Sequence, residues 1–193
     1  MHQIDNTYLT LEKLHEIVHE QQAIELSQDA SKRILDCRSF LDKQSDNSTP
    51  IYGVNTGFGS LCNESISQEN LEELQVNLVI SHACGLGEEV PSSIVKLMLL
   101  LKVQSLSYGY SGIQLETVNR LIDFYNEDIL PVVYQQGSLG ASGDLAPLAH
   151  LSLPLLGLGE VYYKGKKVKS EQVLKEMAWK PICLKSKEGL ALL

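Results

Sequence analysis

The sequence predicts a mainly helical fold that carries one small β-hairpin. Apolar residues recur at three- and four-residue spacing in five stretches, which is the pattern of helices with one buried face. Aromatic residues make up only 6% of the 193 residues, and only two short stretches favour strands. A chain of this length can bury a sizeable core without disulfides or metals, and it is long enough for one ordinary domain or two small ones.

The first two expected helices follow residues that commonly cap helix N-termini. Thr10 precedes an apolar stripe over 11–18, and Ser27 precedes a second stripe over 30–41. The next stretch, 46–50, reads Asp-Asn-Ser-Thr-Pro and predicts a loop.

Three more helices are expected in the middle of the chain. Pro91 is suited to open a helix over 94–105, which is apolar nearly all round and is therefore expected in the core. A further amphipathic helix is expected over 115–125. The helix over 67–81 precedes both, and we expect its buried stripe to be Leu71, Leu74 and Leu78.

The two stretches that favour strands differ in strength. Residues 51–54 suggest a short strand that runs straight into glycine-rich sequence. Residues 161–168 alternate around Gly165 and predict a hairpin with its turn near that glycine.

Charge and cysteine usage restrict the class of protein. The formal net charge of −8 argues against general binding to nucleic acids or anionic membranes, because both need a positive field. No basic-then-apolar signal segment opens the chain, and its most apolar run is too short to span a bilayer. The four cysteines show no paired spacing, so we expect reduced thiols and a cytoplasmic protein.

One sequence pattern matches a zinc site. His15-Glu16-Ile17-Val18-His19 fits H-E-x-x-H, which on a helix aligns two imidazoles for zinc with a glutamate as base. A zinc metallohydrolase is therefore one hypothesis. The alternative is a solvated helix face, which the polar flanks and the lack of a third ligand at a convincing spacing favour.

Glycine concentrates in a few loops, above all 52–59 and 137–143. Glycine-rich loops between strong helices are where a functional site is expected. The loop 137–143 precedes an expected helix near Asp144. It is therefore compatible with either a phosphate-binding loop (a phosphate cradle) or a tight turn before the helix. The cradle is disfavoured because no G-K-[ST] lysine follows.

A third reading concerns the triplet Ala141-Ser142-Gly143 within that loop. In a compressed turn the Gly143 nitrogen can attack the Ala141 carbonyl carbon, since glycine has no Cβ to block the approach. Loss of water from the ring and of the Ser142 hydroxyl then leaves an exocyclic methylidene. The product is a strong electrophile made without an external cofactor.

Several ordered segments give this reading a family context. GSLGASGDLAPLAH at 137–150 resembles the prosthetic-group loop of the aromatic amino-acid ammonia-lyases. YGVNTGFG at 52–59 resembles the tyrosine loop of that family, and SHACG at 81–85 resembles the end of its substrate-binding helix. GYSG at 109–112 and KEGLALL at 187–193 also match, in the same order.

The resemblance implies a fold, a prosthetic group and roles for several residues. It implies the N-terminal part of the helical ammonia-lyase fold, in which Ala141, Ser142 and Gly143 form 4-methylidene-imidazol-5-one (MIO). Asp144 would assist formation of the ring, and Tyr52 would handle the β-proton of the substrate.

The resemblance also implies a small-molecule amino-acid substrate. Ser81-His82 at the substrate-binding position is the pair found in histidine-specific members, which implies formation of trans-urocanate from L-histidine. A tyrosine or phenylalanine ammonia-lyase, or an aminomutase of the same family, is the alternative. His150 is expected to be structural.

Family members are much longer than this chain and form homotetramers. The resemblance therefore implies that residues 1–193 are the N-terminal, MIO-forming portion of a longer enzyme. We expect this portion to be inactive by itself, without a metal and without any external cofactor.

Overall fold

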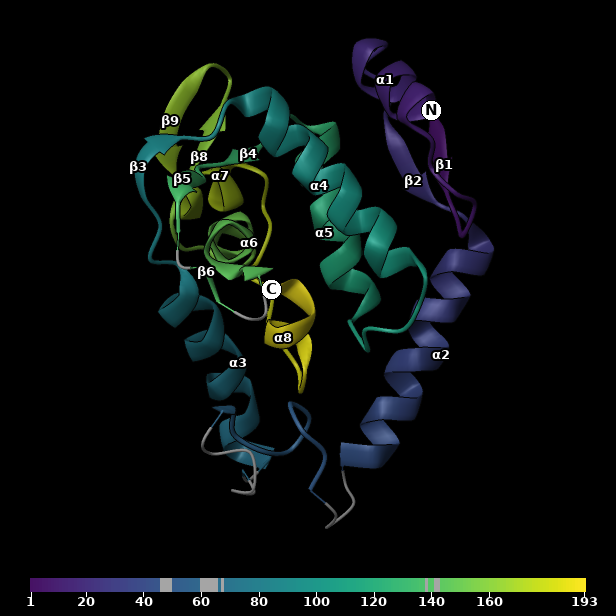
Figure 1. Ribbon diagram of the computed structural model, residues 1–193, viewed down its shortest axis with the longest axis vertical. Helices are drawn as coiled ribbons and strands as arrows, with labels where there is room; N and C mark the ends of the chain where they lie inside the picture. The colour runs from purple at the N-terminus through teal and green to yellow at the C-terminus, as the bar shows by residue number, and fades with distance from the viewer. Residues whose placement is uncertain (46–49, 60–65, 67, 138, 141–142) are drawn as a thin grey trace.

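The computed structural model describes residues 1–45, 50–59, 66, 68–137, 139–140 and 143–193. Helices α4 (Ser92–Ser107) and α5 (Leu115–Asn126) run side by side through the middle of the molecule (Figure 1). A group of short strands lies at one end of this pair, and the N-terminal elements lie against its other side. The mainly helical fold expected from the sequence is confirmed.

The N-terminal elements form a small unit around one strand pair. Strand β1 (His2–Ile4) pairs in parallel with β2 (Ile24–Leu26), and α1 (Leu11–His19) connects them. The expected caps are confirmed: Thr10 Oγ1 accepts from the Lys13 amide at 3.2 Å, and Ser27 Oγ accepts from the Ala30 amide at 3.0 Å. Helix α2 (Gln28–Ser45) follows the second cap.

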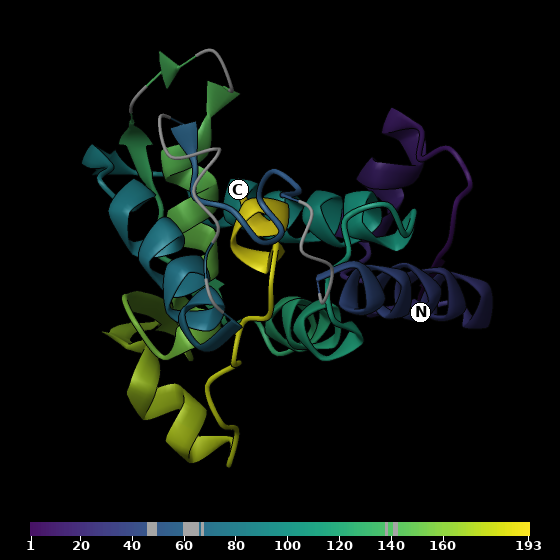
Figure 2. The same cartoon turned by 90° about the horizontal axis from the view of Figure 1, so that it is seen from below.

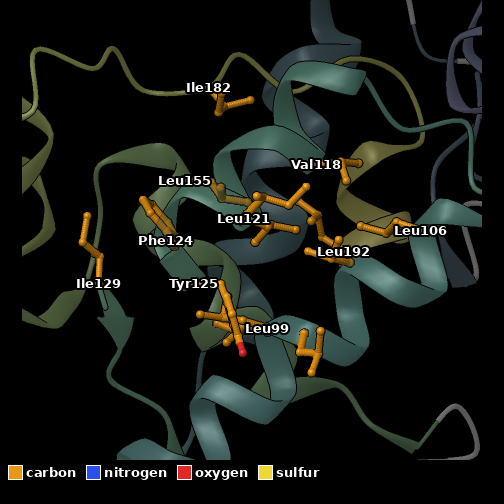
Figure 3. Packing of buried hydrophobic residues seen from close by; sticks show 14 of the residues in the cluster. Leu99, Leu106, Val118, Leu121, Phe124, Tyr125, Ile129, Leu155, Ile182 and Leu192 are labelled. Carbon is orange, nitrogen blue, oxygen red and sulfur yellow. The ribbon is translucent and has the colours of Figure 1, made fainter. Parts of the chain in front are cut away.

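The main core lies between α4, α5 and the C-terminal segments. Figure 3 shows Leu99 and Leu106 from α4 meeting Leu121, Phe124 and other apolar side chains from α5 and beyond. Helix α4 is less buried than expected from its sequence, because Ile94 and Leu101 are each 46% exposed. One face of this helix therefore lies outside the core.

Helix α3 (Gln68–His82) buries a different stripe from the expected one. Leu71, Gln75 and Val79 are buried, whereas Leu74 and Leu78 are only half-buried. The expected stripe is thus wrong by one position in each of the two later turns. Its buried face includes a glutamine, which an analysis of apolar spacing does not select.

Short strands connect the C-terminal half of the fold. Strands β8 (Glu160–Tyr163) and β9 (Lys166–Lys169) form the expected hairpin, and β4 (Leu130–Pro131) extends it. Strand β3 (Leu86–Glu89) pairs with β5 (Tyr134–Gln136). The remaining helices are α6 (Leu145–Ser152), the 3-10 helix η2 (Leu153–Leu156), α7 (Ser170–Glu176) and α8 (Glu188–Leu192).

The expected strand at 51–54 is wrong, because these residues form a turn. The Val54 amide donates to the Ile51 carbonyl oxygen at 3.0 Å, and Gly53 adopts a positive φ of 72°. The Asn55 side chain also accepts from the Ile51 amide at 2.7 Å. Side-chain hydrogen bonds of this kind favour turns over extended backbone.

The described residues also bear on the expectations about membrane spans and cysteines. None of the helices in the described part of the chain is long and apolar enough to cross a membrane. Cys37, Cys84 and Cys183 are free thiols, and Cys62 lies outside the described residues.

Candidate active site

Tyr52 lies in the turn that replaces the expected strand. Its side chain is 55% exposed, and its ring packs edge-on against Phe58 with 5.9 Å between ring centroids. The backbone beneath it is fixed by the hydrogen bonds of the turn, including Gly53 N to Thr56 Oγ1 at 3.3 Å. A rigid turn therefore presents an exposed phenol.

The turn is held from below by the segment that leads into α8. Ser186 Oγ donates to the Val54 carbonyl oxygen at 2.5 Å. A Cβ placed on Gly53 would lie 2.7 Å from Leu190 Cδ2, so glycine allows α8 to approach the turn closely. Figure 2 shows the yellow α8 next to the blue chain of this region.

Ser81 and His82 end helix α3. His82 Nδ1 lies 2.8 Å from the Leu78 carbonyl oxygen, which can only accept a hydrogen bond, so Nδ1 carries the proton. Ser81 Oγ donates to the same carbonyl at 3.0 Å. Nε2 is therefore the ring nitrogen that His82 has left to bond a ligand, on a ring that is only half-buried.

The glycine-rich loop is held at its base by two short strands. Strand β6 (Leu139–Gly140) pairs antiparallel with β7 (Gly143–Asp144), so that Gly140 faces Gly143 and Leu139 faces Asp144. Gly143 has a φ of +94°, and apart from its chain neighbours no described residue has an atom within 4 Å of the position that a Cβ would take. Ala141 and Ser142, which carry the predicted prosthetic group, lie outside the described residues.

The end of α3 contacts the helix that follows this loop. The Gly85 amide donates to Nε2 of His150 in α6 at 3.0 Å. The His150 side chain is buried, and burial holds its pKa below the usual value. From the sequence, Gly85 was identified only as part of the SHACG segment. Its contact with His150 could not be predicted, because no local sequence pattern indicates a partner 65 residues away.

Helix α8 contacts the elements that carry several of the predicted segments. It packs against both α3 and α6, and the Gly189 amide donates to Gln75 Oε1 in α3 at 3.0 Å. The fully buried Glu188 carboxylate binds the start of α5, accepting from the Gln114 amide at 2.9 Å and from Thr117 Oγ1 at 2.8 Å. Neither Gln75 nor Glu188 was identified from the sequence as important to the site.

The structure thus connects the predicted residues through their supporting elements. Ser81 and His82 are linked to the loop stems through Gly85, and Tyr52 is linked to α8 through Gly53 and Val54. Within the described residues, Tyr52 forms no direct hydrogen bond with Ser81 or His82.

The zinc hypothesis places His15 and His19 on one face of α1, with ring centroids 5.3 Å apart. The Glu16 carboxylate that should act as base accepts from Lys13 Nζ at 2.7 Å. Among the described residues, no three His, Cys, Asp or Glu side chains are grouped so that they could hold a metal ion. The helix face therefore gains no third ligand from that part of the chain.

Comparison with known proteins gives matches over almost the whole chain. Histidine ammonia-lyase of Legionella pneumophila (strain Paris) is 49% identical over 185 residues, which is 96% of this chain and 37% of that protein. The crystal structure of histidine ammonia-lyase from Trypanosoma cruzi has a TM-score of 0.88 and 38% identity, covering 98% of this chain and 36% of that chain. The structure of the phenylalanine aminomutase of Pantoea agglomerans has a TM-score of 0.92 and 31% identity. The match covers 100% of this chain and 37% of that chain.

The chain therefore spans a little over a third of the length of these relatives. A family model described as aromatic amino acid lyase matches residues 9–193, which include every segment of the site described above. The chain belongs to the aromatic amino acid lyase family.

Proposed function

We propose that the full-length protein is a histidine ammonia-lyase, which eliminates ammonia from L-histidine to give trans-urocanate in the first step of histidine degradation. The observation that carries the proposal is the His82 ring at the end of α3, whose Nδ1 bonds to the Leu78 carbonyl oxygen and leaves Nε2 for a ligand. The histidine ammonia-lyases among the similar proteins support the same substrate.

The argument for the substrate rests on hydrogen-bond complementarity. The imidazole of histidine carries an N–H group, which can donate to Nε2 of His82. A phenyl ring carries no such donor and would leave Nε2 unpaired on binding. Sites built to hydrogen-bond a substrate discriminate strongly against analogues that lack the group, because the polar atom of the site then loses its partner.

The base of the glycine-rich loop fits formation of MIO from Ala141, Ser142 and Gly143. Gly140 pairs with Gly143, so the two residues that flank Ala141-Ser142 in the sequence lie opposite each other. Gly143 has a positive φ and no side chain, which suits attack by its nitrogen on a neighbouring carbonyl carbon. MIO supplies an electrophilic carbon that retains the substrate while ammonia departs.

The other predicted residues have separate tasks in the proposal. Asp144, opposite Leu139 in β7, assists formation of the ring. Tyr52 removes the β-proton of the substrate, for which an exposed phenol on a rigid turn is well placed. Ser81 shares the Leu78 carbonyl with His82 and keeps the imidazole oriented.

The proposal extends to the assembly and setting of the enzyme. Residues 1–193 act as the N-terminal MIO-forming domain of a cytoplasmic homotetramer that binds a small amino acid and neither nucleic acid nor membrane. The net charge of −8 is consistent with that choice of partners. Residues 1–193 alone are expected to be inactive.

The test uses the full-length protein, its Ser142→Ala variant and Ser105→Ala, which changes an exposed serine of α4, as the control. The parent and the control are expected to be lighter than their sequences by two waters and to convert L-histidine into urocanate. Ser142→Ala is expected to lose both properties. Normal turnover by Ser142→Ala would contradict the proposed chemistry, and products from L-phenylalanine or L-tyrosine instead of urocanate would contradict the proposed substrate.

A further inference from the structure

The two stems of the loop over 137–143 converge on one residue of the segment that follows α3. Strand β5 precedes the loop and α6 follows it. A Cβ on Gly85 would lie 3.1 Å from Tyr134 Cβ in β5 and 3.0 Å from Nε2 of His150 in α6. Gly85 comes three residues after His82, so the predicted specificity residue and the loop stems share this contact point.

His150 makes the polar part of this contact. Its Nε2 accepts from the Gly85 amide at 3.0 Å, and a nitrogen that accepts carries no proton. The imidazole is therefore neutral, with its proton on Nδ1. Its ring also packs edge-on against Tyr134, with 5.1 Å between centroids and 74° between ring planes. Both the direction and the orientation of the ring are thus fixed.

The surroundings of the imidazole favour this neutral form. His150 is 9% exposed and lines a cavity of about 160 Å³ with Tyr134 from β5 and Glu160 from β8. The Glu160 carboxylate pairs with Lys167 Nζ at 3.2 Å, and the same lysine pairs with Glu89 at 2.7 Å. Burial disfavours the charged form of the ring and holds the pKa of His150 below its usual value.

Helix α3 ends in a tight turn just before this contact. After His82 the backbone leaves the helix through a turn in which the Cys84 amide donates to the His82 carbonyl oxygen at 2.8 Å. The Gly85 amide is the next donor along the chain, and it bonds to a side chain 65 residues away. Beyond it, β3 pairs with β5, so within the described part of the chain His150 is the first long-range hydrogen-bond partner after His82.

We propose that His150 is a positioning residue, which holds the Ser81-His82 end of α3 in a fixed place relative to β5 and α6, the two elements that flank the loop over 137–143. The inference rests on the proposed function, because it assigns that relative placement to substrate recognition. A displacement of about 1 Å between a binding group and the reacting centre can lower turnover by about 100-fold.

The first arm of the test measures the contact itself, independently of activity. Hydrogen exchange of the 83–88 segment is compared in full-length parent, His150→Gln and His150→Phe. Gln keeps an acceptor at a similar reach, whereas Phe keeps a ring of similar size without an acceptor. Parent-like exchange in His150→Gln and faster exchange in His150→Phe are expected, and unchanged exchange in His150→Phe would overturn the inference.

The second arm separates positioning from stability. Leu155→Ala serves as the control, because Leu155 is fully buried in the core and is not among the nearest neighbours of the Cβ position of Gly85. His150→Phe is expected to raise the KM for histidine or lower kcat by about 10- to 100-fold while keeping the two-water mass loss. His150→Gln is expected to keep KM and kcat close to those of the parent. Leu155→Ala is expected to unfold at a lower temperature while its KM and kcat stay close to those of the parent. Equal kinetic losses in all three variants would show a merely structural role.

A second variant covers a failure of His150→Phe to fold. Gly85→Ala approaches the contact from the other side, since its Cβ must push the imidazole or Tyr134 away. The same kinetic loss is expected, and parent-like constants would overturn the inference. If the parent acts on another aromatic amino acid, the proposed substrate fails, and the same variants are compared on that substrate.

Discussion

The side-chain oxygen of Gln75 accepts the backbone amide of Gly189 at 3.0 Å, and the two helices meet where glycine is the only residue that fits. A Cβ on Gly189 would lie 2.8 Å from the Gln75 carbonyl oxygen, which belongs to helix backbone and cannot move aside cheaply. The close approach of α8 to α3 therefore depends on the absence of a side chain.

Gly189→Ala is predicted to destabilise the protein by about 1–3 kcal/mol through overpacking. The measurement is the midpoint of thermal unfolding of the full-length protein. Gly165→Asn is the control, because Gly165 lies in the β8–β9 turn with nothing within 4 Å and asparagine tolerates its positive φ. Equal midpoints for the two variants would contradict the proposed clash.

Glu188→Gln is predicted to be destabilising although it preserves shape. The buried carboxylate accepts from the Gln114 amide, Thr117 Oγ1 and the Lys185 amide, the last at 2.7 Å. The side-chain NH₂ group of a glutamine would face the backbone N–H of Gln114 or Lys185, which also donates. The lost hydrogen bond is predicted to lower the free energy of unfolding by about 1–3 kcal/mol. Glu116→Gln, on the exposed side of α5, should leave the melting midpoint unchanged, and a similar loss in both variants would refute the argument.

Acid is predicted to weaken the fold through His150. Burial lowers the pKa of His150 below its usual value of 6.5, so the unfolded chain takes up a proton more readily than the folded one. The contribution of the neutral ring is therefore complete above about pH 6.5 and is lost as the pH falls through the lower folded pKa. The melting midpoint of the parent should drop more between pH 7 and pH 5 than that of His150→Gln, and parallel curves would be evidence against the prediction.

Base is predicted to strengthen the fold through Lys102. Burial lowers the pKa of this lysine to about 8, and its Nζ donates to the Ala191 carbonyl oxygen at 3.1 Å. The folded protein loses the proton before the unfolded chain does, so this contribution to stability rises with pH from about 8 upward. The parent should gain stability relative to Lys102→Met over that range, whereas the exposed Lys32→Met should show no such trend.

Local patterns in the sequence predicted those parts of the fold that local interactions determine. The caps at Thr10 and Ser27 and the turn at Gly165 depend on residues within a few positions, and all three are confirmed. The buried stripe of α3 was wrong, because Gln75 is buried by its bond to Gly189 and not by hydrophobicity. No local pattern reveals a partner 114 residues away.

The candidate site divides in the same way. Tyr52, Ser81 and His82 were identified from family-like segments, and their roles remain proposals. The residues that support them became visible only in three dimensions, since Glu188 and His150 act through contacts across 74 and 65 residues. Residues 51–54 were misread because the turn depends on the side chain of Asn55, which alternation of apolar residues does not register.

The segment over 185–189 also sets the order in which the protein can fold during synthesis. Its bonds reach back 71 residues from Glu188 to Thr117 and 148 residues from Ser186 to Arg38. Helices α2, α3 and α5 therefore leave the ribosome with polar groups whose partners have not yet been translated. Contacts of such long range slow folding, so the nascent N-terminal helices depend on protection from aggregation until this short segment emerges.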